Sequence, residues 1–164
     1  MASFENTIKN PILFRLYLFT RLPSAFFAGL RISHLSPDVC TVTVPYKWFT
    51  RNPFRSTYFA CLAMAAEMST GVLAMSGVYK RKPPVSMLVT HLEANYFKKA
   101  TGRTTFTCTD GAQIREAIEK AVASGEGQII RARSAGASPT GEPVAEFFIT
   151  WSFKPKASKI PSGI

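Results

Sequence analysis

The pattern of apolar and polar residues predicts helices and strands along most of the chain. Residues 11–22 carry apolar side chains at helical spacing, which predicts a helix that ends at Pro23. Residues 30–35 and 39–44 alternate apolar and polar positions on either side of a Ser-Pro-Asp turn, a pattern typical of a β-hairpin. The patterns in the first quarter of the chain therefore predict an extra N-terminal helix followed by two paired strands.

The most apolar segment, residues 56–79, carries a single charge, on Glu67. Ser56 or Thr57 can cap a helix at its start, and Gly77 can end that helix. The segment is long enough to cross a membrane, but a helix wrapped on all sides by protein has the same composition. Because amphipathic strands follow and no second such segment occurs, we expect a buried core helix and no membrane span.

The second half of the chain predicts four more strand segments and one short amphipathic helix that begins at Asp110. The strands are expected at residues 85–97, 103–109, 128–135 and 143–153. Strands grouped in hairpins indicate an antiparallel sheet and an α+β class, with the sheet curled around the apolar helix. We expect an N-terminal helical extension at 1–26, one domain at 27–155 and a flexible tail at 156–164.

The charge of the chain and its cysteine content indicate a class of partner and a cellular compartment. The chain has 20 Lys and Arg against 10 Asp and Glu, which gives a net charge of +10. This charge suits an anionic partner such as a nucleic acid, a membrane surface or coenzyme A. A role in solubility alone also explains it. Cys40, Cys61 and Cys108 stand among apolar or β-prone neighbours, so we expect buried thiols and a cytoplasmic protein. No spacing typical of a metal site or a cofactor-binding loop is present, so we expect neither.

The segment from Asn52 to Gly71, NPFRSTYFACLAMAAEMSTG, resembles the loop and central helix of hot-dog thioesterases. In those enzymes an Asn precedes a His-Gly pair at the helix start, and an Asp or Glu follows about two turns later. Glu67 lies fifteen residues after Asn52, similar to the spacing in the phenylacetyl-CoA-type branch. Residues 95–102 resemble a strand end of that branch, and residues 22–32 resemble an uncharacterised thioesterase-like subfamily with an extra N-terminal helix.

The resemblance covers roughly residues 20–155 and implies a hot-dog fold, a curled antiparallel sheet around one central helix. It also implies homodimers, with further assembly to tetramers open, whose sites lie at the subunit interface. The implied ligand is acyl-CoA or another acyl thioester. The chain departs from the family where Tyr58 and Phe59 replace the His-Gly pair, since the glycine that admits a substrate carbonyl is missing.

Glu67 is the residue most informative about chemistry. A lone carboxylate in an apolar helix is costly to bury as an ion, so its pKa should rise, and such groups are enriched at functional sites. As a carboxylate it can activate water or attack a thioester carbonyl directly. The structural alternative is a glutamate that reaches a dimer interface and is satisfied there by an arginine or by backbone N–H groups.

Other residues could support that carboxylate. The Phe59 N–H at the helix start can hold a developing oxyanion, and Tyr58 beside it is expected to contact the substrate. Asn52 can orient the carbonyl or the attacking water, or can serve only as a turn former. Ser69 and Thr70 lie within one turn of Glu67 and could hold its water or the acyl group, although such side chains more often bond to their own helix. Three basic residues, Arg81, Lys82 and Lys98, suit the phosphates of coenzyme A or a solvated rim.

Two functions, hydrolysis and binding, are therefore considered first. The first is a thioesterase that hydrolyses acyl-CoA or a related acyl thioester and uses Glu67 as general base or nucleophile. The second is a protein that binds a fatty acyl chain or acyl-CoA without catalysis, which the missing His-Gly pair favours. Nucleic-acid binding ranks last, because the sequence has neither a basic helix nor aromatic residues interleaved with basic ones, and we expect no nucleic-acid partner.

Overall fold

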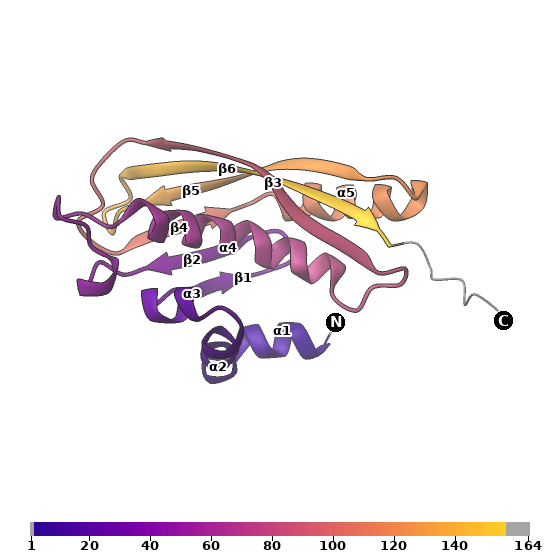
Figure 1. Cartoon of the computed structure of the whole chain (residues 1–164), viewed down its shortest axis with the longest axis horizontal. Coiled ribbons are helices and arrows are strands. Elements are labelled where there is room, and N and C mark those ends of the chain that lie inside the picture. Colours follow the sequence, from indigo (N-terminus) through magenta and orange to yellow (C-terminus); the bar gives the residue numbers. More distant parts are fainter. Residues whose placement is uncertain (1, 157–164) are drawn as a thin grey trace.

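The computed structural model describes residues 2–156 and shows a sheet that curls around one long helix (Figure 1). The elements in chain order are α1 (Ala2–Lys9), α2 (Pro11–Arg21), α3 (Pro23–Ala28), β1 (Arg31–Leu35), β2 (Cys40–Val44), a 3-10 turn (Trp48–Thr50), α4 (Phe59–Val78), β3 (Val85–Tyr96), β4 (Thr104–Cys108), α5 (Gly111–Ser124), β5 (Gln128–Ala137) and β6 (Pro143–Pro155). This order confirms the α+β class, the hairpin and the four later strands.

The sheet has six strands in the order β1-β2-β4-β5-β6-β3, and every neighbouring pair is antiparallel. Strands β1 and β3 are the two edges, and α4 runs along the inner face between them (Figure 1). A helix enclosed by a curled antiparallel sheet is the hot-dog arrangement that the sequence predicts. Strand β3 is long, and within residues 2–156 it pairs on one edge only, so its other edge is a surface suited to pairing with another strand.

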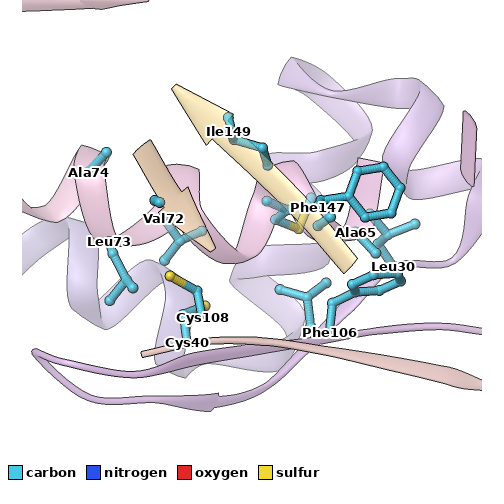
Figure 2. Packing of buried hydrophobic residues seen from close by; sticks show 14 of the residues in the cluster. Leu30, Cys40, Ala65, Val72, Leu73, Ala74, Phe106, Cys108, Phe147 and Ile149 are labelled. Atoms are coloured by element: carbon cyan, nitrogen blue, oxygen red, sulfur yellow. The ribbon is translucent and has the colours of Figure 1, made fainter. Parts of the chain in front are cut away.

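The core lies between α4 and the inner face of the sheet. Strands β2 and β4 both alternate buried and half-buried residues, so that every second side chain faces α4. The rings of Phe106 on β4 and Phe147 on β6 are 5.6 Å apart and lie near Ala65 of α4 (Figure 2). Cys40 and Cys108 face each other across the paired strands, and burial raises the pKa of each thiol to about 12. With Cys61 also buried, all three cysteines are core residues, as predicted.

The apolar segment that has the length of a membrane span forms helix α4. It is the one helix within residues 2–156 that is long and apolar enough to cross a membrane. Most of the apolar stretch is buried inside the protein, against strands of the sheet and against α5. A helix covered on several sides needs apolar residues around its whole circumference, so its composition reflects the core of the fold.

Two helix boundaries differ from the prediction. Pro23 ends α2 but also begins α3, because proline is well tolerated in the first turn of a helix. The N-terminal extension therefore holds three helices where one was predicted. Gly77 does not end α4, which continues to Val78. A Cβ at Gly77 would lie 2.5 Å from Cδ1 of Ile118, so this glycine allows α5 to pack closely on α4.

One of the two predicted helix caps is confirmed and the other is wrong. Asp110 occupies the cap position of α5, as predicted, and its carboxylate accepts a hydrogen bond from the Arg133 backbone N–H at 2.7 Å, which ties the helix start to β5. Neither Ser56 nor Thr57 caps α4. The predicted tail at 156–164 lies outside the described residues except for Lys156, whose N–H donates to the Pro84 carbonyl at 2.8 Å.

Candidate functional site

Glu67 lies in the middle of α4, half-buried, in a largely apolar setting. Burial raises the pKa of its carboxyl group. Its Oε1 atom lies over Gly71, one turn further along the helix, where a Cβ would be only 2.9 Å away. The six-membered ring of Trp151, on β6, covers the same glycine. Among the described residues no hydrogen bond or ion pair satisfies this carboxylate, so the carboxylate is free to interact with a ligand.

Gly71 and Trp151 shape this site, and sequence reasoning did not single them out. Gly71 follows Glu67 by four residues, so the two share one helix face, and that spacing was a usable signal. Trp151 is eighty-one residues from Thr70, yet its Nε1–H donates to the Thr70 hydroxyl at 2.9 Å. Such a long-range contact has no local sequence signature.

The hydroxyls of Ser69 and Thr70 bond within the protein, including to their own helix, which is the structural alternative considered for them. Both are fully buried. The hydroxyls of Ser69 and Ser134 lie 2.8 Å apart across the helix–sheet contact, and the Ser69 hydroxyl also donates to the Ala66 carbonyl. Thr70 donates to the Glu67 carbonyl and accepts from Trp151. The two side chains therefore attach α4 to the sheet and fix the indole beside Glu67.

The start of α4 offers unpaired backbone donors. Tyr58 occupies the cap position but its side chain makes no capping hydrogen bond, while its N–H donates to the Thr50 carbonyl at 2.7 Å. The Cys61 N–H donates back to the Tyr58 carbonyl. Within the described part of the chain the N–H groups of Phe59 and Ala60 have no acceptor. The rings of Tyr58 and Phe59 are exposed and contact each other edge to face, with centroids 4.9 Å apart.

The loop before α4 is held together by Asn52. Its Oδ1 atom accepts hydrogen bonds from the Phe54 N–H at 3.0 Å and from the N–H and the hydroxyl of Ser56, both at 3.2 Å. The Thr57 hydroxyl donates to the Ala100 carbonyl, which ties the loop to the segment after β3. The oxygen of Asn52 is thus used within the loop, and only its amide N–H groups are left to meet a ligand.

The basic residues predicted to bind coenzyme A do not gather at one place. Arg81 makes a two-point ion pair with Glu119, with contacts of 2.8 and 2.5 Å, and Lys98 pairs with Glu142 at 2.8 Å. Arg81 and the exposed Lys82 precede β3, whereas Lys98 follows it. A strand of this length spans about 40 Å at roughly 3.3 Å per residue. One subunit therefore cannot place all three cations on one phosphate group.

The two halves of the predicted chemistry are also separated within one chain. Glu67 follows Phe59 by eight residues, which is about 12 Å along a helix. The carboxylate lies over Gly71 and so points further from the helix start. A carbonyl group held by the Phe59 N–H is thus out of reach of the same chain's Glu67.

The curled antiparallel sheet around α4 is a hot-dog fold. The chain belongs to the family described as a domain of unknown function, DUF4442, whose model matches residues 12–152. No curated protein matches the chain.

Solved structures support the fold. A protein of unknown function from Pseudomonas aeruginosa, described as a probable thioesterase, is 19% identical with a TM-score of 0.75, over 90% of this chain and 97% of that one. A thioesterase from Haemophilus influenzae is 14% identical with a TM-score of 0.62, over 88% and 92%. A mutant thioesterase from Staphylococcus aureus is 13% identical with a TM-score of 0.61, over 81% and 99%.

Proposed function

We propose that this protein hydrolyses an acyl thioester, with acyl-CoA as the expected substrate and Glu67 as the reactive carboxylate. The observation that carries the proposal is the half-buried, unpaired Glu67 on the core helix, whose pKa burial raises. A carboxylate with no protein partner retains its full basicity for an incoming water or acyl group. The similarity to structures described as thioesterases favours the same reaction class.

In the simplest mechanism Glu67 acts as general base. It takes a proton from water while the water oxygen bonds to the thioester carbon, and the carbonyl oxygen becomes an oxyanion. A backbone N–H at an α4 N-terminus holds that oxyanion. When the C–S bond breaks, the thiolate takes up the proton from Glu67, and the products are a carboxylic acid and a free thiol. Alternatively, the Glu67 carboxylate attacks the carbonyl carbon, and the C–S bond breaks to release the thiolate and leave an anhydride. Water then hydrolyses the anhydride to the carboxylic acid and the free Glu67 carboxylate, and the proton released from that water goes to the thiolate.

The proposed site is shared between two subunits. Because Glu67 and the Phe59 N–H of one chain are about 12 Å apart along α4, a carbonyl can meet both only if one group comes from a second copy. The long unpaired edge of β3 is the surface we propose for that pairing. The resulting dimer could also bring Arg81 and Lys82 of one subunit toward Lys98 of the other, because paired edge strands run antiparallel about a twofold axis. Assembly to tetramers and a cytoplasmic location stay predictions.

Replacing Glu67 tests this function directly. Glu67→Gln keeps the size of the side chain but removes the base, and loss of a catalytic base typically costs about 10²–10⁴-fold in rate. The assay measures thiol release from a panel of acyl-CoA esters that differ in chain length and aromaticity. Glu126→Gln, at an exposed position after α5, is the matched control and should keep full activity. Unchanged turnover in Glu67→Gln would exclude Glu67 from the mechanism.

Binding without catalysis is the second candidate function. The observation that favours it is the pair Tyr58 and Phe59 at the position of the family's His-Gly pair, since exposed rings surround the N–H that would hold the carbonyl. The same acyl-CoA panel separates the two functions. Tight binding of an ester with no thiol release by the unaltered protein would select the binding function.

A further inference from the structure

A large groove lies along the β1 edge of the sheet, beside the N-terminal helices. It has a volume of about 1130 Å³ and runs between helices α1 and α2 on one side and strand β1 on the other. Arg31 and Thr43 pair on the outer face of the sheet, whereas Ile32 pairs with Val42, which is buried toward α4. Residues from both faces of the edge strand β1 therefore line the groove. Neither Glu67 nor Phe59 lines it, so it is separate from the proposed catalytic site.

The walls of the groove combine apolar and cationic side chains. Apolar contacts come from Ile8 and Ile12 on the helices and from Ile32 on β1. Ile12 is 79% exposed, which is a large apolar exposure for a helix that already packs against the domain. A ligand with an apolar chain would cover this surface.

Four cations, Arg15, Arg31, Lys47 and Arg103, line the same groove, and none of the aspartates and glutamates whose side chains the structure describes does. None of the four makes an ion pair within the part of the chain that the structure describes. Four positive charges without a counter-charge repel one another and attract an anion. The groove is thus suited to a ligand with a negatively charged end.

Arg15 gives the most specific indication of a ligand. Its guanidinium lies over the ring of Phe26, 4.1 Å from the ring centroid, so its position is fixed by packing. Its Nη1 atom is buried and has no hydrogen-bond partner among the residues that the structure describes. A buried donor without an acceptor is unfavourable, and an anionic oxygen entering the groove would satisfy it.

We infer that this groove binds a single-chain amphipathic anion, an alkyl or acyl chain that ends in a phosphate or a carboxylate. The arginines would hold the head group, since their planar donors match both anions, and Ile8, Ile12 and Ile32 would contact the chain. A second copy of this protein fits poorly, because it also carries a net charge of +10. A nucleic acid supplies the negative charge but has no alkyl chain for the apolar wall.

Titration calorimetry on the full-length protein tests the inference, with dodecyl phosphate and dodecanoate below their micelle concentrations. At least one of the two should bind saturably, and the preferred one identifies the head group. Inorganic phosphate should bind at least about tenfold more weakly, and dodecyltrimethylammonium should not bind. Equal binding of the cationic detergent, or binding of phosphate as tight as that of the amphiphiles, would overturn the inference.

Two matched pairs of variants distinguish binding in the groove from attraction to the net charge of the protein. Arg31→Gln with Arg103→Gln removes two charges from the groove, and Lys154→Gln with Lys156→Gln removes two near the other edge of the sheet, on and just after β6. The first pair should weaken binding by at least about tenfold and the second by less than about twofold. An equal loss in both pairs would show that only the net charge matters, against the inference.

Ser33→Trp tests the groove without changing any charge. Ser33 is exposed and lines the groove, so an indole there should fill the space and abolish amphiphile binding while the thermal unfolding midpoint stays unchanged. Vesicles that contain anionic lipid supply the last comparison. If Ser33→Trp bound such vesicles and the soluble amphiphiles as the unaltered protein does, the interaction would be adsorption to the surface and the groove would not be the site.

Discussion

The carboxylate of Glu67 occupies the space that a side chain on Gly71 would need, because a Cβ at Gly71 would lie 2.9 Å from Oε1 of Glu67. The same Cβ would lie 3.3 Å from the Trp151 ring, so the carboxylate, at the end of a flexible side chain, is the group that would move. The absence of a side chain at Gly71 therefore helps set the direction in which the proposed catalytic group points.

The first prediction concerns Gly71→Ala. The added methyl group should displace the Glu67 carboxylate and lower the rate of thioester hydrolysis by about tenfold or more, as small misplacements of catalytic groups commonly do. Stability should change little or rise by up to about 1 kcal/mol, since alanine favours the helix over glycine. Thiol-release kinetics and urea denaturation measure the two effects. A large loss of stability together with activity would mean that Trp151 cannot yield, and the activity loss would then be uninformative about Glu67.

The second prediction concerns pH and stability. Burial raises the pKa of Glu67 in the folded protein, so folding disfavours its ionised form. The protonated Glu67 side chain therefore contributes to the free energy of unfolding. This contribution is fully present below the unfolded-state pKa of about 4.3 and is lost as pH rises through the folded-state pKa. Glu67→Gln should therefore unfold at a higher temperature than the unaltered protein at pH 7, by about 2–4 °C for each kcal/mol gained. The difference should shrink as pH falls toward 4.5. A variant that is less stable at pH 7 would show that the ionised carboxylate has a stabilising partner.

Much of the fold could be predicted from the chain because the patterns involved are local. The apolar circumference of α4 and the alternation in β2 each reflect how one element meets the core, so neighbouring residues reveal them. Gly77 was misread because the glycine faces Ile118, which lies on another helix. The contacts of Ser69 with Ser134 and of Thr70 with Trp151 could not be predicted for a similar reason, since they are fixed by how α4 packs on the sheet.

The candidate site was only partly predictable. Glu67 was found because a single charge in an apolar helix is visible in the sequence. Its neighbour Trp151 and the groove beside α2 arise where distant segments meet, and no local pattern encodes such contacts. The separation between Phe59 and Glu67, in contrast, follows from helical rise alone and could have been derived from their spacing.

The third prediction isolates the contact that supports the site. In Thr70→Val the indole N–H of Trp151 loses its buried acceptor, which typically costs about 1–3 kcal/mol of the free energy of unfolding. Thr70→Ser keeps the hydroxyl and is the matched control, with an expected loss of less than about 1.5 kcal/mol for the missing methyl group. Chemical denaturation followed by tryptophan fluorescence measures both. An unchanged free energy of unfolding in Thr70→Val would show that the hydrogen bond does not contribute to stability.

The last prediction tests whether the site is shared between subunits. Phe59 is the first residue of α4, where proline is well tolerated, and Tyr58 before it is already extended at φ −60° and ψ 132°. Phe59→Pro should therefore remove the N–H donor without breaking the helix and abolish activity, whereas Phe59→Ala, which keeps the donor, should retain much of it. Glu67→Gln should be inactive for the separate reason that it lacks the base.

Unfolding and reassembling these two inactive proteins together decides the arrangement. If each site takes its donor from one subunit and its carboxylate from the other, a mixed dimer regains one intact site. Random pairing would then restore about a quarter of the unaltered activity. A site contained in one chain would give no recovery, because every chain in the mixture lacks one of the two groups. Sizing chromatography of the mixture must show dimers, since a monomeric protein that hydrolyses thioesters would also rule out the shared site.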